Sequence, residues 1–189
     1  MLIGNNVTNE IKGTVERSNL KNIQAIVLHR TVSSSSESPI NNAVNSEGIV
    51  GFHLIIDKDG SITQIVSFNN KANHVGRPTG ETSNNNSIGV EVVGWSLNKD
   101  GNPEMNWKNV TGWEELTDEQ KASAAFAVYA IMDNYNLDME DVYPHEDVSR
   151  KQEGEGRTVL KAIKGLLTLM NELFNTPPPP NEESIVVKN

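Results

Sequence analysis

Two short apolar runs predict the centre of a β-sheet. Residues 22–30 (NIQAIVLHR) are rich in β-branched residues and predict a strand that is buried on both faces. Residues 87–95 (SIGVEVVGW) predict a second strand whose apolar residues share one face, so that Glu91 projects from the other. His29 lies near the carboxyl end of the first run, and α/β sheets place their chemistry at that edge.

A third apolar segment alternates with period two. Residues 51–68 (GFHLIIDKDGSITQIVSF) predict a β-hairpin that turns at Asp-Lys-Asp-Gly. Its first half is expected to place Phe52, Leu54 and Ile56 on one face. His53 is then expected to point to the opposite face.

Helical periodicity is confined to the second half of the chain. The capping box Thr-Asp-Glu-Gln predicts a helix over residues 117–135, and residues 159–174 repeat apolar positions at the spacing of an amphipathic helix. Residues 33–48 predict a polar loop with a short helix after Pro39. Residues 96–116 predict a long connection, a kind of segment that is usually functional or mobile.

Length and composition limit how these elements are organised. The chain has 189 residues, of which 36% are hydrophobic, and this is enough for one domain with a full core. We expect that domain to span residues 1–176, with its core at 22–174. Four consecutive prolines then predict that residues 177–189 are a linker and a flexible tail.

Charge and cysteine content exclude several classes of function. The net charge of −9 argues against nucleic acid as a partner and favours a neutral or glycan-like substrate. The chain has no cysteine, which excludes disulfides and thiolate chemistry. We recognise neither a classical export signal nor an apolar window of membrane-spanning length, so we expect no membrane insertion.

Four histidines are the candidate metal-binding residues. His29, His53, His74 and His145 are spread along the chain, and the last precedes a charged stretch at residues 146–153. Catalytic zinc binds neutral imidazoles and carboxylates around one open position. This set of residues therefore predicts a zinc site.

The order of these motifs resembles the zinc-dependent N-acetylmuramoyl-L-alanine amidases. The motifs are VLH, GFHLIIDKDG, Asn73-His74, NNSIGVEVVG and, after a helix, His145 followed by Lys151 and Glu153. The family includes peptidoglycan recognition proteins, cytoplasmic muropeptide-recycling amidases and certain phage lysozymes. The resemblance covers residues 22–174 and implies an α/β single domain, with a central mixed β-sheet flanked by α-helices, as in the peptidoglycan recognition protein-like amidase fold.

The resemblance also implies a zinc ligand set. His29 and His145 match the two imidazole ligands of the family. The third ligand, commonly Asp or Cys two residues after a lysine, matches Glu153, and Glu155 is the second candidate. A glutamate is longer than the usual ligand, so we expect a shifted backbone that a neighbouring glycine permits.

Further roles follow from the resemblance and from what each side chain can do. Family members carry either a glutamate in the strand that matches NSIGVE or a tyrosine before the hairpin histidine. Phe52 occupies the tyrosine position here and cannot transfer a proton, which leaves Glu91 as the general base. Lys151 would stabilise the oxyanion, and His74 would contact the substrate carbonyl or lactyl group. His53 would be structural or would orient a ligand.

The implied reaction is hydrolysis of the amide between N-acetylmuramic acid and L-alanine in peptidoglycan. A lytic enzyme, phage endolysin-like or secreted against competitors, is the favoured setting, acting on the cell wall in the periplasm or outside the producing cell. An immunity protein is then a candidate partner. The alternatives are a binding module without catalysis, a cytoplasmic muropeptide-recycling amidase and a zinc hydrolase for another amide. The three tryptophans would either stack on sugars or pin the 96–116 loop to the body.

Overall fold

The computed structural model describes residues 9–10 and 16–175. The predicted linker and tail at 177–189 lie outside these residues. Within the described part, no helix is both long and apolar enough to cross a membrane.

A mixed six-stranded sheet forms the centre of the fold, with the strand order β1-β4-β3-β5-β2-β8. The strands β3, β5, β2 and β8 run parallel to one another, whereas β4 is antiparallel to β3 and β1 is parallel to β4. Their bounds are β1 Asn9–Glu10, β2 Ala25–Arg30, β3 Leu54–Ile56, β4 Ile62–Gln64, β5 Ser87–Val92 and β8 Val142–Pro144. Parallel central strands bring their carboxyl ends to one edge, and this edge carries the candidate site.

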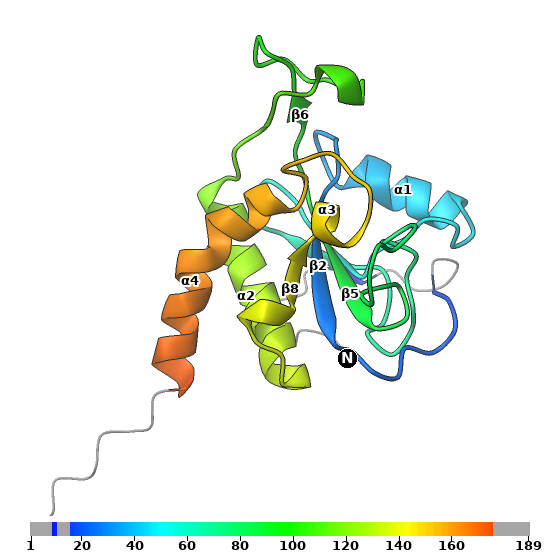
Figure 1. Ribbon diagram of the computed structural model, residues 1–189, viewed down its shortest axis with the longest axis vertical. Coiled ribbons are helices and arrows are strands. Elements are labelled where there is room, and N and C mark those ends of the chain that lie inside the picture. Colours follow the sequence, from blue (N-terminus) through cyan, green and yellow to red (C-terminus); the bar gives the residue numbers. More distant parts are fainter. Residues whose placement is uncertain (1–8, 11–15, 176–189) are drawn as a thin grey trace, which may run out of the picture.

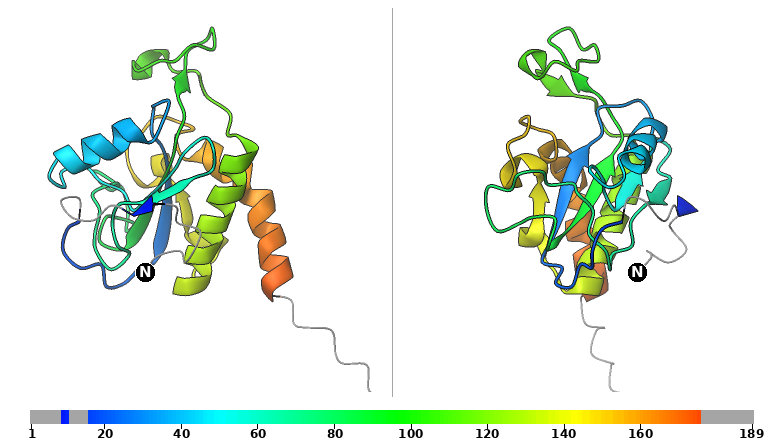
Figure 2. Two further views of the ribbon diagram at one scale, coloured as in Figure 1. Left: turned by 180° about the vertical axis from the view of Figure 1, so that it is seen from behind. Right: turned by 90° about the vertical axis from the view of Figure 1, so that its right-hand side faces the viewer.

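The two faces of the sheet are covered differently. The helices α2 (Asp118–Tyr135) and α4 (Arg157–Asn175) pack side by side against one face (Figures 1 and 2). Their apolar residues form the main core with the even-numbered residues of β2, β3 and β5. On the opposite face, α1 (Glu37–Asn45) buries Ala43 in a smaller cluster with Ile55. The chemistry-bearing side chains lie on this second face.

Most of the predicted elements are confirmed, with one error in a strand face. β2 is buried at every position, and α2 begins with the predicted capping box. Leu54 and Ile56 lie in the main core as expected, but Phe52 packs in the smaller cluster with Ile55. The reason is that β3 begins only at Leu54, so Phe52 precedes the regular alternation.

Several short elements have no clear signal in the sequence. They are β8 and the single-turn helix α3 (His145–Val148), and, within the predicted long connection, a small second sheet. That sheet pairs β6 (Ser96–Leu97) with β7 (Gly112–Trp113) in antiparallel fashion. The 3-10 turns η2 (Trp107–Asn109) and η3 (Met139–Asp141) complete the set of short elements.

Gly156 allows the chain to pass against the end of the sheet. A Cβ at this position would lie 2.6 Å from the backbone nitrogen of His145 and 2.7 Å from Cα of Pro144, and it would also overlap the carbonyl oxygen of Leu28. All three atoms belong to backbone at β2, β8 or α3, which cannot move aside as a flexible side chain would. The segment before α4 therefore reaches this edge only because residue 156 has no side chain.

We predict that Gly156→Ala lowers the free energy of unfolding by about 1–3 kcal/mol, because it overpacks a backbone crossing. Gly165 in α4 is the matched control, since a Cβ there would meet nothing within 4 Å. Gly165→Ala should raise the free energy of unfolding by about 0.5–1 kcal/mol, because alanine is the better helix former. Urea unfolding of both variants measures the difference, and equal effects would contradict the packing argument.

Candidate metal centre

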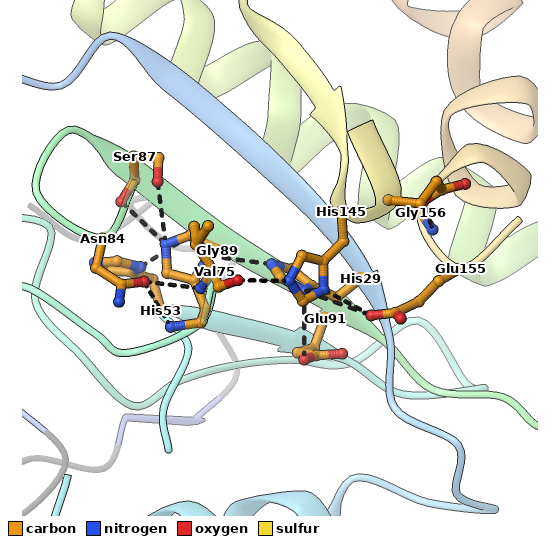
Figure 3. Close-up of polar contacts among 12 residues, drawn as sticks. His29, His53, Val75, Asn84, Ser87, Gly89, Glu91, His145, Glu155 and Gly156 are labelled. Carbon is orange, nitrogen blue, oxygen red and sulfur yellow. Dashed lines mark hydrogen bonds and ion pairs between the residues drawn. The ribbon is translucent and has the colours of Figure 1, made fainter. Parts of the chain in front are cut away.

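Three residues from separate segments meet at the carboxyl edge of the sheet. His29 lies in β2, His145 begins α3 directly after β8, and Glu155 lies in the turn before α4. Glu91 in β5 joins them because it is paired in register with His29. Figure 3 shows the two imidazoles side by side, with the carboxylates of Glu91 and Glu155 both directed toward them.

The ligand-type atoms lie close to one another. Nδ1 of His29 is 2.7 Å from Nδ1 of His145, which is 2.7 Å from Oε1 of Glu155. Nδ1 of His29 lies 3.9 Å from the same Glu155 oxygen and 4.0 Å from Oε1 of Glu91. His29, His145 and Glu155 are all buried, and their ligand atoms lie within 4.8 Å of one another.

Hydrogen bonds fix the proton positions on two of the histidines. Nε2 of His74 donates to the Ser87 carbonyl at 3.3 Å, which leaves Nδ1 of His74 as an acceptor. Nε2 of His29 donates to that acceptor at 3.1 Å, so that Nδ1 of His29 carries a lone pair. Burial lowers the pKa of both His29 and His74 well below the ordinary value, and neighbouring histidines lower it further, so both imidazoles stay neutral.

His145 is oriented in the same way. Its Nε2 donates to the Val75 carbonyl at 3.2 Å, and its Nδ1 faces His29 and Glu155. A carbonyl that holds the outer nitrogen of an imidazole sets the ring for binding a metal through the inner one.

This donor set fits a divalent cation. A single proton between the three groups would satisfy one lone pair, whereas a cation would satisfy all of them. Oε2 of Glu155 and Oε2 of Glu91 are both buried and have no hydrogen-bond partner among the described residues. Two imidazoles and one carboxylate form a known catalytic zinc set that leaves a position for water.

The structure brings Glu155, and not Glu153, to the two histidines. Glu153 is exposed, and its backbone carbonyl accepts a hydrogen bond of 3.0 Å from the Trp113 indole. Gly154 follows with φ of 84°, a left-handed conformation that reverses the chain and directs residue 155 inward. The geometry therefore favours Glu155, the second candidate, as the third member of the cluster.

Glu91 lies beside the cluster of His29, His145 and Glu155 without belonging to it. Burial raises its pKa from the ordinary 4.5 to about 8, and the charge of Glu155 contributes in the same direction. Lys151 and Arg30 oppose the rise. A group with a pKa near neutrality can both accept and return a proton at working pH.

Two cations border the site, and sequence reasoning identified one of them. Lys151 is exposed and lines the same cavity of about 580 Å³ as His29, Glu91 and Glu155. Arg30 was missed, although its position directly after the apolar run is a signal. It is 3% exposed and donates from Nη2 to the Glu114 carbonyl at 2.9 Å, and burial lowers its pKa to about 10.

The other two histidines lie behind the cluster. Both ring nitrogens of His74 are occupied, as described above, and a Cβ at Gly89 would meet its ring at 2.6 Å. This arrangement makes His74 a positioning residue for His29. His74 also lines the same cavity as His29 and Glu91, and its predicted contact to substrate stays a prediction. His53 accepts from the Gly89 amide at 2.9 Å and donates to the Asn70 carbonyl at 3.0 Å, so it serves the fold.

Fold and site together define an α/β protein with a buried His-His-Glu set at the carboxyl edge of parallel strands. The family model of N-acetylmuramoyl-L-alanine amidase matches residues 19–157. The chain therefore belongs to the N-acetylmuramoyl-L-alanine amidase family, as its motifs predicted, and is an enzyme of that class. A search of the curated proteins found no match.

Solved structures support the assignment of the fold. The crystal structure of a selenomethionine AmpD derivative matches with a TM-score of 0.63 and 16% identity over 86% of this chain and 95% of that one. The endolysin N-acetylmuramoyl-L-alanine amidase LysCS from Clostridium intestinale URNW matches with a TM-score of 0.53 and 20% identity, covering 85% and 99%. The catalytic domain of XlyA matches with a TM-score of 0.60 and 18% identity, covering 85% and 98%.

We predict that Glu91→Gln stabilises the metal-free protein increasingly as pH rises. The unfolded chain loses this proton near pH 4.5, whereas the folded chain keeps it up to about pH 8, so the wild type loses stability between these values. The glutamine, which never ionises, escapes the loss and should gain roughly 2–4 kcal/mol over wild type by pH 8.

Denaturant unfolding of chelator-treated protein at pH 5 and pH 8 measures this difference. The matched control is Glu153→Gln, which removes an exposed carboxylate from the same region and should show no growing gain. A constant difference between wild type and Glu91→Gln at both pH values would contradict the assigned shift.

Proposed function

We propose that this chain is a zinc-dependent amidase that cleaves the bond between N-acetylmuramic acid and L-alanine in peptidoglycan. The observation that carries the proposal is the convergence of His29, His145 and Glu155 on one point beside Glu91. The family match supports the substrate class. In this ligand set Glu155 takes the place that the sequence motif gave to Glu153.

The residues around the cluster supply the remaining chemistry. Bound zinc would act as a Lewis acid that lowers the pKa of water and polarises the amide carbonyl. The Glu91 carboxylate accepts a proton from the attacking water, whose oxygen forms the new bond to the carbonyl carbon. As the C–N bond breaks, Glu91 returns the proton to the leaving amine of L-alanine. The Lys151 ammonium stabilises the developing negative charge on the carbonyl oxygen.

We infer that the enzyme acts lytically on the cell wall, outside the cytoplasm of the cell that makes it. The likeness to an endolysin amidase supports this setting. Muropeptide recycling, which the resemblance in sequence motifs also implies, stays the alternative. A non-catalytic binding module would not need a complete set of metal ligands, whereas Glu155 could complete such a set here with His29 and His145. An immunity protein stays a candidate partner of a secreted enzyme.

The activity is tested by adding zinc-loaded protein to purified sacculi and measuring the release of stem peptides. We expect one zinc per chain and hydrolysis at the lactyl amide. Glu91→Ala should retain zinc and lose about two to four orders of magnitude in turnover, the usual size of a general-base contribution. Zinc-free protein that binds sacculi without releasing peptide would support the binding module instead.

The ligand set is tested by Glu155→Ala against Glu153→Ala. Removing a buried ligand should weaken zinc binding by more than the roughly 10–100-fold typical of outer-shell changes. Removing the exposed Glu153 carboxylate should leave zinc affinity unchanged. Competition with a chelating dye measures both constants. The reverse order of effects would return the third ligand to Glu153.

A further inference from the structure

Residues 96–113 form an arm that rises from the body beside the site (Figures 1 and 2). The β6–β7 pair joins its two ends, and its base is fastened to the body on both sides. The Trp95 amide donates to Oε2 of Glu114 at 3.0 Å, and the Trp113 indole donates to the Glu153 carbonyl at 3.0 Å. Trp113 therefore pins the arm to the turn that carries Glu155.

The outer part of the arm exposes apolar side chains toward the site. Trp107 is 48% exposed and Met105 is 75% exposed, and both line the cavity that contains His29 and Glu155. Val50, 44% exposed, lines the same cavity from the segment between α1 and β3. Folding leaves these surfaces in contact with water, so they are available to a ligand.

A second cavity, of about 770 Å³, adjoins the first and shares Lys151 with it. Arg77 and Arg150 line it, on segments held together by two hydrogen bonds. The Thr79 amide donates to the Val148 carbonyl at 2.9 Å, and the Ser149 hydroxyl donates to the Arg77 carbonyl at 3.0 Å.

The second cavity is cationic in a chain with a net charge of −9. Within the described part of the chain, Arg77, Arg150 and Lys151 form no ion pair with an acidic side chain. Lys151 therefore stands between the cavity that the apolar side chains of the arm border and a cationic cavity on the other side.

We propose that the two cavities hold opposite ends of the substrate, with the glycan against Trp107 and the stem peptide against Arg77 and Arg150. The inference rests on the proposed function and adds the direction in which the substrate lies across the site. The scissile amide joins a neutral N-acetylated sugar to a peptide that carries carboxylates. An indole offers a flat apolar face to a sugar ring, and arginine forms paired hydrogen bonds with a carboxylate.

The direction in which the substrate lies across the site follows from complementarity of charge. A carboxylate-bearing peptide against the arm would exchange water for the apolar side chains of Trp107 and Met105, and a neutral glycan over the exposed arginines would gain no attraction from their charges. With the glycan against the arm and the peptide against the arginines, each end of the substrate meets side chains of matching chemistry. The arm is then a specificity element that selects glycan-linked stem peptides over free ones.

The glycan end is tested with soluble substrates of one, two and four sugars that carry the same peptide. Wild type should prefer the longer glycans, and Trp107→Ala should raise KM for the four-sugar substrate by about tenfold with kcat nearly unchanged. Trp107→Tyr should restore most of the loss because it returns an aromatic face. The matched control is Lys108→Ala, an exposed neighbour outside the cavity, which should behave as wild type.

The peptide end is tested with stem peptides whose carboxylates are free or amidated. The double variant Arg77→Gln/Arg150→Gln should raise KM several-fold for the free carboxylates and leave the amidated substrate unchanged. High salt should reduce the difference between wild type and variant, because these charges are exposed.

Two outcomes would contradict this direction of substrate binding while leaving the proposed function intact. One is an active enzyme in which Trp107→Ala affects all glycan lengths equally or has no effect. The other is an exchange of phenotypes, with the arginine variant sensing glycan length and the tryptophan variant sensing peptide charge. A wild type that hydrolyses none of the substrates would instead overturn the proposed function, and this inference with it.

Discussion

The structure depends on the burial of three lone-pair donors at one point. Nδ1 of His145 lies at hydrogen-bonding distance from both Nδ1 of His29 and Oε1 of Glu155, and the neutral His29 ring directs a lone pair toward it. Groups of this kind repel unless a cation lies among them, and water does not screen them in the interior. Neighbouring polar groups orient the two imidazoles. The Val75 carbonyl accepts from Nε2 of His145 and the His74 ring accepts from Nε2 of His29, so that both Nδ1 atoms face the cluster.

Close backbone packing is what brings these groups together. Gly89 leaves room for the His74 ring over β5, and Gly156 lets the segment before α4 cross the end of β2. The same packing removes water from Glu91, which raises its pKa to about 8. The protein therefore gives up stability at neutral pH to keep this carboxyl group, the proposed general base, buried.

The two sides of the site differ in chemistry in the same way as the two sides of the proposed scissile bond. The arm places apolar side chains beside the site, whereas the segment around Arg77 contributes positive charge from the loop that also contains Val75. Trp113 fastens the arm, and Trp107 stays exposed on it. One tryptophan of the connection therefore pins the loop, and the other faces the cavity.

The sequence by itself determined the strands β2 to β5, the main helices and the position of His29 near the end of β2, because burial imposes periodicity and β-branching that a single chain displays. It also marked Glu91, since alternation alone assigns its face. Tertiary structure decided which glutamate joins the two histidines: the resemblance to the family motif implied Glu153, but the left-handed turn at Gly154 and the bond from Trp113 direct Glu155 inward. Side-chain direction in an irregular turn depends on contacts from distant segments, and no local pattern in the sequence encodes them.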